Sequence, residues 1–312
     1  MKTYFITGVM GFVGSHWAEK ILKNGNKVIG VDIHDDSKHL KDFKNFEFIK
    51  DTIIDNKLML EKHIEKSDYV LHLASIAEPD QYMIRPKKII NIAAIAAIDI
   101  IDICFKLKKK IFFTSTSEIY GKNNSVPFSE NDDRVLGSTT TKRWCYSTSK
   151  ALVEHYLEAS AINDGLDFRI VRLFNVYGPR LKGRVVSKFI EKALKNENLE
   201  INGSGNQTRC FTYIDDAIDA FEKILDSENC KNQIFNVGTD KEISIRDFAK
   251  VVIKVLNSNS KLIDISYEKQ FGNSYEDIQR RVPSIKKIKE FVDWEPSIFL
   301  EEGIKKLAKT YE

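Results

Sequence analysis

The chain has 312 residues, of which 42% are hydrophobic and 30% are charged, an ordinary composition for a globular protein with a sizeable core. Its 48 basic and 45 acidic residues give a net charge of +3, which gives no general reason to expect nucleic acid as a partner. The longest apolar run, residues 89–103, is interrupted by polar residues and is too short to span a bilayer, so we expect no membrane segment.

The apolar stretch at the N-terminus is too short for a signal peptide and runs directly into a glycine loop, which predicts a cytoplasmic protein. The four cysteines lie far apart and lack the spacing of metal ligands, so we expect reduced thiols. The six histidines are scattered singly, and we predict no metal site.

Short β-rich apolar runs alternate with helical stretches through the first half of the chain. We predict strands at residues 4–7, 27–32, 46–50, 69–73, 111–115 and 167–173, and helices at residues 15–24, 89–108 and 149–161. Strands separated by helices form a parallel sheet covered on both faces. The pattern therefore predicts an α/β fold with a doubly wound, Rossmann-like parallel sheet, in which residues 1–176 bind a dinucleotide.

The pattern changes after residue 176. We predict helices at residues 184–194, 215–225 and 244–256, a short strand at 199–201, and a strand at 233–237 that returns to the main sheet. Residues 177–312 are thus expected to form mainly a smaller C-terminal substrate lobe, with segments between residues 210 and 240 returning to the first domain.

A glycine loop lies between the first predicted strand and the first predicted helix. Gly8 allows a tight turn, Gly11 lets a pyrophosphate approach the backbone, and Gly14 lets the helix pack on the strand, with Phe12 and Val13 in the same loop. The spacing is G-x-x-G-x-x-G, and a glycine triplet alone is weak evidence. The strand before the loop and the helix after it favour a dinucleotide site over a structural turn.

Asp32 ends the second predicted strand, about 20 residues after the loop, where a carboxylate binds the hydroxyls of the adenosine ribose. The alternative is a turn residue at a strand end. Because a carboxylate repels a 2′-phosphate, the ribose-binding interpretation favours NAD over NADP as the cofactor.

Tyr146 and Lys150 lie four residues apart where a helix is predicted to open, so they share one helix face. A nearby ammonium group can lower the pKa of a phenol, which would make Tyr146 a usable base toward a sugar hydroxyl. A surface Tyr/Lys pair is the alternative, since this spacing also occurs by chance.

The predicted strand at residues 111–115 ends by presenting Thr116, Ser117 and Glu118 at the carboxyl edge of the sheet. A hydroxyl there can share a hydrogen bond with the substrate hydroxyl that Tyr146 deprotonates. Serine and threonine at a strand end are often only turn residues. Together with the glycine loop and the Tyr/Lys pair, they favour a catalytic site.

These motifs together resemble the extended short-chain dehydrogenase/reductases, a family of NAD-dependent nucleotide-sugar epimerases, dehydratases and decarboxylases. The resemblance runs through residues 2–306 in the segments TGVMGFVGSH, LHLAS, STSEIYG, YSTSK, RLFNVYGPR, RVVSKFI, NGSGNQTRCFTYIDD and QRRVPSIKKIK. It implies an enzyme that uses NAD to oxidise C4 of a UDP-sugar transiently, and it implies that NAD is regenerated.

The resemblance also implies roles for single residues. Thr116, Tyr146 and Lys150 match the family's catalytic hydroxyl, tyrosine and lysine, with Ser117 and Glu118 beside them. The implied cofactor-binding positions beyond the glycine loop, Asp32, Tyr146 and Lys150 are Asp51, Thr52, Leu73, Ala74, Ser75 and Asn91, where Thr52 replaces a usual apolar residue. The implied substrate-binding residues are Arg143, Asn175, Arg184, Val185, Arg209 and Arg281. The last set is otherwise explained as strand-end and surface residues, but a diphosphate needs cationic partners.

Within the family, residues 115–118 and 143–146 resemble UDP-glucuronate decarboxylases, including the decarboxylase half of a bifunctional lipid A-modifying enzyme, and residues 183–187 and 204–209 resemble UDP-xylose synthases. The 4,6-dehydratases carry an Asp-Glu pair where this chain has Ser117 and Glu118. UDP-glucuronate decarboxylation is therefore the favoured function, and UDP-glucuronate or UDP-glucose 4-epimerisation is the alternative. A non-catalytic nucleotide-sensing protein would be expected to lack Tyr146 and Lys150.

The resemblance to decarboxylases predicts a UDP-hexuronic acid as substrate. Arg143, Arg184 and Arg209 are the candidates to meet its carboxylate or its diphosphate, because a guanidinium group can donate two parallel hydrogen bonds. The predicted helices at residues 89–108 and 149–161 match the helices that form the family's dimer interface, so a homodimer is expected. Burial within the monomer explains the apolar face of the first helix equally well.

Overall fold

The computed structural model describes residues 1–36, 38–266 and 278–311, and the chain divides into two compact units. Unit 1 contains Met1–Ile119, Gly137–Arg172 and Phe221–Phe235, and unit 2 contains Tyr120–Leu136, Leu173–Ala220 and Asn236–Glu312. Neither unit is continuous in the sequence. Each unit therefore depends on contacts between segments that are far apart along the chain.

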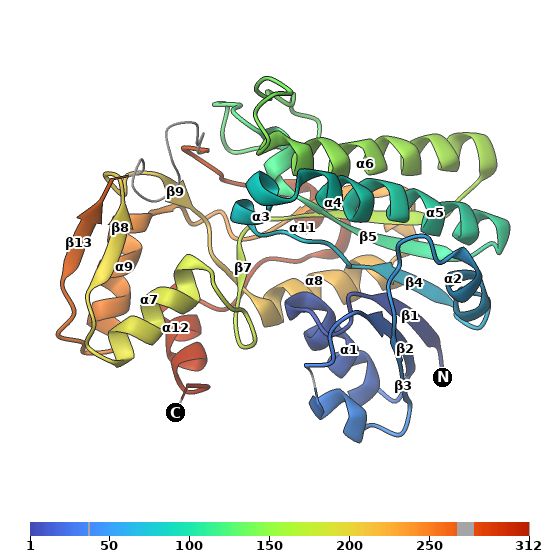
Figure 1. The fold of residues 1–312 in the computed structure, drawn as a ribbon, viewed down its shortest axis with the longest axis horizontal. Coiled ribbons are helices and arrows are strands. Elements are labelled where there is room, and N and C mark those ends of the chain that lie inside the picture. Colours follow the sequence, from blue (N-terminus) through green and yellow to red (C-terminus); the bar gives the residue numbers. More distant parts are fainter. Residues whose placement is uncertain (37, 267–277, 312) are drawn as a thin grey trace. The chain divides into compact units, whose positions relative to one another are not determined.

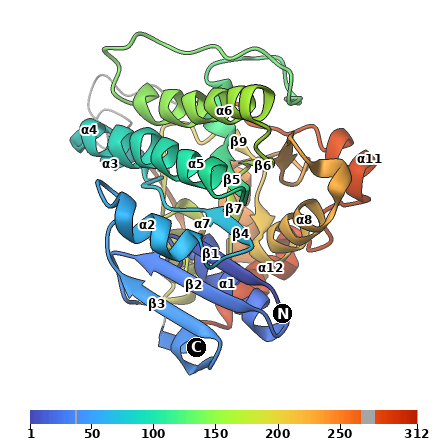
Figure 2. The ribbon, with the colours of Figure 1, turned by 90° about the vertical axis from the view of Figure 1, so that its right-hand side faces the viewer.

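A seven-stranded sheet forms the framework of unit 1, with the order β3-β2-β1-β4-β5-β6-β11 (Figures 1 and 2). The strands are β1 (Thr3–Thr7), β2 (Lys27–Asp32), β3 (Phe46–Lys50), β4 (Tyr69–His72), β5 (Lys110–Thr116), β6 (Phe168–Leu173) and β11 (Gln233–Val237). The pairs β1–β2, β1–β4, β2–β3 and β4–β5 are parallel. The order 3-2-1-4-5-6 is that of dinucleotide-binding sheets, so the predicted doubly wound fold is confirmed, including the strand that returns at residues 233–237.

Helices cover both faces of this sheet (Figure 2). They are α1 (Phe12–Lys23), α2 (Lys57–Ile64), α3 (Pro79–Ile84), α4 (Pro86–Ile90), α5 (Ala96–Lys106), α6 (Trp144–Asp164) and α8 (Ile214–Asp226). On one face, apolar residues of α2, α5 and α6 pack in a single core with the strands. On the other face, Trp17 of α1 packs against Phe112 and Phe221, with ring centroids 4.7 and 5.0 Å away. The strands are thus buried on both sides, which explains their nearly continuous apolar sequences.

The sequence misplaced two helices. The predicted single helix at residues 89–108 begins earlier, at Pro86, and a π-helical turn at Asn91–Ile95 separates α4 from α5. The apolar pattern could not reveal this turn, because isoleucine and alanine continue through it. The helix predicted at 149–161 begins at Trp144, so Tyr146 lies inside α6. Helix α2 was not predicted at all.

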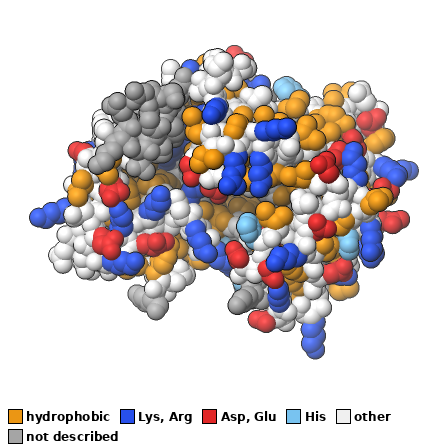
Figure 3. Space-filling view, viewed as in Figure 1, with side chains coloured by type: hydrophobic (Ala, Val, Ile, Leu, Met, Phe, Trp, Pro, Cys, Tyr) orange, Lys and Arg blue, Asp and Glu red, His pale blue; other side chains and the backbone are white. Residues whose placement is uncertain are grey.

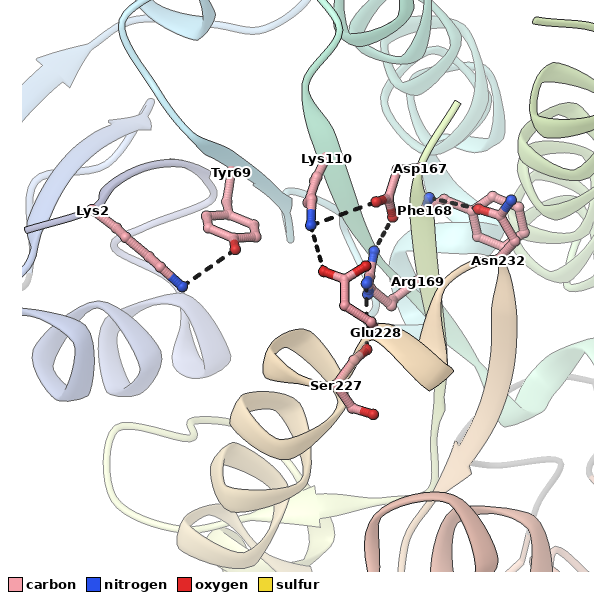
Figure 4. A network of polar contacts seen from close by, with 9 residues as sticks. All are labelled: Lys2, Tyr69, Lys110, Asp167, Phe168, Arg169, Ser227, Glu228 and Asn232. Carbon is pink, nitrogen blue, oxygen red and sulfur yellow. Dashed lines mark hydrogen bonds and ion pairs between the residues drawn. The ribbon is translucent and has the colours of Figure 1, made fainter. Parts of the chain in front are cut away.

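A network of polar contacts joins the starts of β5 and β6 to the turn after α8 (Figure 4). The Lys110 ammonium contacts Glu228 at 2.7 Å and Asp167 at 3.7 Å. The Arg169 guanidinium, which is fully buried, donates to Asp167 and to the carbonyl oxygen of Ser227. These contacts stabilise the edge of the sheet at which its strands begin. The predicted site residues of unit 1 lie at the opposite edge, where the strands end.

Unit 2 is built from three short strand pairs and a helical layer. The pairs are β7 (Val176–Tyr177) with β10 (Thr212–Tyr213), β8 (Leu199–Asn202) with β13 (Leu262–Ile265), and β9 (Thr208–Arg209) with β12 (Ile243–Ser244). The helices are α7 (Val185–Leu194), α9 (Ile245–Val255), α11 (Lys286–Val292) and α12 (Leu300–Ala308). Phe248 of α9 packs against Phe189 and Phe211, which joins α7 and α9 in one core. Over the described ranges of the chain, no helix is long and apolar enough to cross a membrane.

His72 joins the ends of the two central strands of unit 1. The Thr7 hydroxyl accepts hydrogen bonds from the backbone N–H groups of Leu73 and Ala74, both at 3.2 Å, and lies 2.8 Å from His72 Nδ1. These contacts tie the ends of β1 and β4 together. The ring is fully buried and stacks on Phe113. Burial, with a smaller effect from Lys150, lowers the pKa of His72 to about 3.

This burial predicts a specific sensitivity to acid. Because the pKa of His72 is lower in the folded state than in the unfolded state, stability is lost as the pH falls from about 6.5 toward about 3. The slope due to this one group is about 1.4 kcal/mol per pH unit inside that window. Urea unfolding between pH 7 and pH 4.5 should show a weaker pH dependence for His72→Asn than for the native chain. The exposed His34 provides the control His34→Asn, which should keep the native slope. Equal slopes for His72→Asn and the native chain would contradict this account.

Candidate active site

The glycine loop between β1 and α1 is too tight for side chains. The backbone N–H of Gly11 donates to the carbonyl oxygen of Gly8 at 3.0 Å. A Cβ atom on Gly14 would lie 2.1 Å from that same oxygen, and Gly8 adopts a φ of +71°. Helix α1 begins at Phe12, directly after the loop, so its free backbone N–H groups lie at the carboxyl end of β1. The loop can therefore accept a phosphate against bare backbone.

The end of β4 approaches this loop closely. A Cβ atom on Gly8 would lie 2.8 Å from Cα of Ala74, so the chain at Leu73 and Ala74 runs against the turn. Ser75 follows, and its buried hydroxyl has no hydrogen-bond partner among the described residues. A buried hydroxyl without a partner is unusual in a folded protein and suits a polar ligand.

Asp32 lies at the carboxyl end of β2, next to the glycine loop. Its carboxylate accepts hydrogen bonds from the backbone N–H of Met10 at 2.9 Å and from that of His34 at 3.0 Å. Each carboxylate oxygen keeps a second lone pair for another donor, such as a ribose hydroxyl. Asp32 thus shapes the loop as well as offering a negative charge beside it.

The other predicted cofactor positions lie in two places. Asp51 and Thr52 form a turn directly after β3, in which the Asp51 carboxylate accepts from the Thr52 N–H at 2.7 Å. Asn91 begins the π-helical turn. It lines a pocket of about 170 Å³ together with Ile54, Asp55, Ile95, Ala96 and Asp99. The sequence did not indicate that Asn91 and the segment after Thr52 share a pocket.

The predicted catalytic residues meet where β5 and α6 pack together. Thr116 is the last residue of β5, and the Lys150 ammonium donates to the carbonyl oxygen of Thr114, two residues earlier, at 2.8 Å. The same ammonium lies 4.5 Å from the centroid of the Phe113 ring. Tyr146 lies one turn before Lys150 on the buried face of α6 and stacks on Tyr82 with a centroid separation of 4.8 Å. The structure therefore brings Lys150 to Thr114, which is 36 positions away in the sequence.

Lys150 is almost completely buried, and this burial lowers its pKa to about 7. The charge of Glu154 opposes this effect by favouring the ammonium form. A lysine in such a setting can change its charge near neutral pH, which is common for residues at functional sites.

Glu118 and Arg143 lie together. A nitrogen of the Arg143 guanidinium is 3.5 Å from each carboxylate oxygen of Glu118, and both side chains are buried. The guanidinium also lies 5.7 Å from the centroid of the Trp144 ring. Sequence reasoning treated Glu118 as catalytic and Arg143 as substrate-binding without predicting this ion pair. A guanidinium has five N–H donors, so contact with Glu118 leaves Arg143 able to bind a further carboxylate.

The remaining predicted substrate residues belong to unit 2. Asn175 has a φ of +37°, and its buried Nδ2 has no hydrogen-bond partner among the described residues. Arg184 and Val185 begin α7. Arg209 donates to the carbonyl oxygen of Ile278 at 2.9 Å, and the backbone N–H of Thr208 donates to that of Gln279 at 2.9 Å. These two bonds place the chain before Arg281 alongside β9, so Arg209 and Arg281 lie in the same part of unit 2.

Sequence reasoning missed two groups near the catalytic residues. One is His72, described above. The other is the pair of Glu154 and Arg172, which are both buried and joined by a contact of 2.6 Å. Glu154 follows Lys150 by the same four positions that separate Lys150 from Tyr146. This repeated spacing was a signal available in the sequence.

The family model described as the NAD-dependent epimerase/dehydratase family matches residues 4–238 of the chain. The chain belongs to this family. The match covers both the glycine loop and the Tyr146/Lys150 pair, and it confirms the family resemblance and NAD as the cofactor.

Individual members of the family are similar over the full chain. A UDP-N-acetyl-alpha-D-glucosaminuronate decarboxylase of Bacillus cytotoxicus is 37% identical over 99% of this chain and 98% of its own length. The bifunctional polymyxin resistance protein ArnA of Wigglesworthia glossinidia brevipalpis is 34% identical over 100% of this chain, which spans only 51% of that protein. The crystal structure of a UDP-glucose 4-epimerase from Thermotoga maritima has a TM-score of 0.89 and 28% identity, covering 99% of this chain and 98% of that one.

The residues of unit 1 fit an NAD-dependent member of this family. The bare backbone of the glycine loop suits the pyrophosphate, Asp32 suits the adenosine ribose, and the buried hydroxyl of Ser75 offers a polar group that needs a partner.

Asp32 should set the choice between NAD⁺ and NADP⁺. Asp32→Asn removes the negative charge and keeps the shape, so it should weaken NAD⁺ binding and lessen the discrimination against NADP⁺. Loss of a charged hydrogen bond of this kind costs about 1.5–3 kcal/mol, and calorimetry with both cofactors measures it. Asp36→Asn changes the same charge on an exposed residue nearby and should leave both affinities unchanged. Tighter binding of NADP⁺ than of NAD⁺ by the native chain would contradict the assignment.

Proposed function

We propose that this protein is an NAD-dependent UDP-hexuronate decarboxylase that transiently oxidises C4 of its substrate. The observation that carries the proposal is the 37% identity, over almost the whole chain, with a decarboxylase named for a UDP-linked hexuronic acid. Thr116 ends β5, and Tyr146 and Lys150 lie on the buried face of α6, where Lys150 bonds to β5; this placement supports the proposal, because these are the groups that oxidation of a hydroxyl needs.

The proposed reaction begins with removal of a proton. Tyr146, as a phenolate, takes the proton of the C4 hydroxyl, and the Thr116 hydroxyl orients that group. Lys150 stabilises the phenolate by its positive charge. The glycine loop and Asp32 would hold NAD⁺, which would supply a reversible hydride acceptor for C4.

The C4 ketone then makes loss of CO₂ possible. The C6 carboxylate is β to this ketone, so the C5–C6 bond breaks and its electron pair moves into an enolate. Hydrogen bonds from Tyr146, now protonated, and from Thr116 stabilise the enolate oxygen. Addition of one proton at C5 and reduction of C4 give a UDP-pentose, so the net change is uptake of a proton and release of CO₂.

The buried pair of Glu118 and Arg143 supports a substrate with a carboxylate. Arg143 is positioned by Glu118 and Trp144 three residues before the catalytic tyrosine, and its guanidinium can donate to a second carboxylate. We further propose that the unit 2 residues Asn175, Arg184, Val185, Arg209 and Arg281 bind the nucleotide diphosphate or the sugar.

C4 epimerisation is the second candidate function. It is favoured by the similarity to a UDP-glucose 4-epimerase with a TM-score of 0.89, and it uses the same oxidation at C4. In that case the 4-keto sugar rotates in the site before hydride returns to the opposite face of C4, and all six sugar carbons remain. A 4,6-dehydratase is disfavoured by Ser117, which stands where those enzymes carry an aspartate.

Product analysis separates these functions. The purified chain with NAD⁺ should convert UDP-glucuronate or UDP-N-acetylglucosaminuronate into a product that has lost one CO₂, as measured by mass spectrometry and NMR. The similarity to the Bacillus enzyme makes the second sugar an essential part of the test. UDP-glucose should turn over far more slowly, because it has no carboxylate to lose or to bind.

The variant Tyr146→Phe is the control for this assay. It keeps the aromatic ring against Tyr82 and removes the base, so turnover should fall by roughly 10²–10⁴-fold while NAD⁺ still binds. A product with six carbons and inverted C4 would establish the epimerase instead. Equal turnover of UDP-glucose and the uronates would overturn the carboxylate hypothesis.

We also propose that the protein is a homodimer through α5 and α6. These helices pack on each other, and they expose the large apolar side chains of Phe105, Leu152 and Ile162, with Ile95 exposed in the turn directly before α5. Figure 3 shows hydrophobic side chains gathered over this part of unit 1. On α6, residues 152, 155, 159 and 162 are all exposed and follow helical spacing, so they form one stripe.

A charge in this stripe should break the dimer. Leu152 is 49% exposed, so Leu152→Asp should leave the fold intact and convert a dimer into a monomer at micromolar concentration, as measured by light scattering. The control is Leu58→Asp on α2, which is 87% exposed and lies outside the stripe. A native chain that is strictly monomeric would overturn this proposal.

A further inference from the structure

A buried polar cluster of Glu154, Arg172 and Ser115 lies one helical turn after Lys150. Arg172 of β6 contacts Glu154 of α6 through three hydrogen bonds, one of 2.6 Å from a terminal nitrogen and two of 3.2 Å from Nε. The hydroxyl of Ser115 also donates to the Glu154 carboxylate. All three side chains are less than a tenth exposed. A buried carboxylate held from two strands has a fixed position.

This cluster connects the catalytic helix to the catalytic strand. Lys150 bonds to Thr114, and one turn later Glu154 bonds to Ser115, the next residue of β5. Consecutive residues of the strand thus hold consecutive turns of the helix. Thr116 follows immediately on the same strand, so the two bonds also fix where the catalytic hydroxyl stands relative to α6.

The charges around Lys150 give the cluster a second effect. From β4, His72 is neutral, because burial keeps its pKa far below neutrality. From β5, Lys150 meets a carbonyl oxygen and an aromatic face, which carry no net charge. From its own helix it is affected by Glu154, whose negative charge stabilises the ammonium against the effect of burial. Arg172 carries the opposite charge and contacts the same carboxylate at 2.6 Å.

We propose that Glu154, anchored by Arg172 and Ser115, is a positioning residue of the active site that holds α6 in register on β5 and keeps Lys150 in its cationic form. The inference rests on the proposed roles of Tyr146 and Lys150. The proposal predicts that removing the charge of Glu154 and removing the charge of Arg172 have opposite effects on the Lys150 ammonium. Without the charge of Glu154, the cation of Arg172 destabilises the Lys150 ammonium. Without the charge of Arg172, the carboxylate of Glu154 stabilises it more strongly.

The titration of Lys150 can be measured directly by NMR. Protein labelled with ¹³C-lysine is titrated without substrate, and the ¹³Cε signal of Lys150 is identified by its absence in Lys150→Met. In Glu154→Gln the titration midpoint should move down by about one pH unit or more, and in Arg172→Gln it should move up by a similar amount. Asp164→Asn removes an exposed carboxylate from the end of the same helix and should leave the midpoint unchanged.

Opposite shifts in the two variants separate a charge effect from a general loss of structure. Unchanged midpoints, or movement of both in the same direction, would overturn the proposal. If Glu154→Gln does not fold, the test uses Arg172→Gln together with Glu154→Asp. Glu154→Asp keeps the negative charge, so its Lys150 midpoint should lie close to that of the native chain. A lowered midpoint in Arg172→Gln would then overturn it. Since no UDP-sugar is present, these results do not depend on which sugar the enzyme converts, and product analysis tests the proposed function separately.

Discussion

The burial of the Lys150 ammonium is the constraint on which the active site depends. An unpaired charge in a protein interior is costly, and here a carbonyl oxygen, an aromatic face and a nearby carboxylate offset that cost. These partners come from one strand, β5, and from α6 itself. The lysine can keep its charge only when α6 is packed correctly on the sheet, so the chemical competence of the site and the packing of unit 1 are linked.

The cofactor side of the site depends on a related constraint at the centre of the sheet. The Thr7 hydroxyl bonds the ends of β1 and β4 together and contacts the ring of His72. The chain after β4 leaves no room for a side chain at Gly8, and the Gly8 carbonyl oxygen leaves none at Gly14. The strand order 3-2-1-4-5-6 then brings the glycine loop, Asp32 and Thr116 to the same edge of the sheet, because parallel strands end on the same side.

Sequence patterns were sufficient to predict the parts of the site whose residues are close together in the chain. The strand, glycine loop and helix at residues 3–23 follow each other directly, so their pattern predicted both the structure and the ligand class. Helix α6 was predicted to begin at Ser149, five residues after its observed start at Trp144, and Ser147 in the missed turn has low helix propensity. In the structure the hydroxyls of Ser147 and Ser149 bond back to carbonyl oxygens of Trp144 and Cys145, and packing overrides propensity.

Contacts between distant residues were not predictable in the same way. The pair of Glu118 and Arg143 joins residues 25 positions apart, and Arg172 reaches Glu154 from another strand. Each of these residues is charged, and a charged residue in a single sequence is most simply explained as exposed. Only the topology of the sheet shows that they are buried and paired around the catalytic residues.

The central claim is that oxidation at C4 is internal, so that hydride leaves the sugar and returns to it. The most direct measurement uses a UDP-hexuronate that carries deuterium at C4, converted by the native chain with NAD⁺ in ordinary water. The account predicts a product that retains the deuterium at C4, with no requirement for added NADH. Loss of the deuterium to solvent during turnover would contradict it, since the bond to C4 would then be broken by proton exchange and not by hydride transfer.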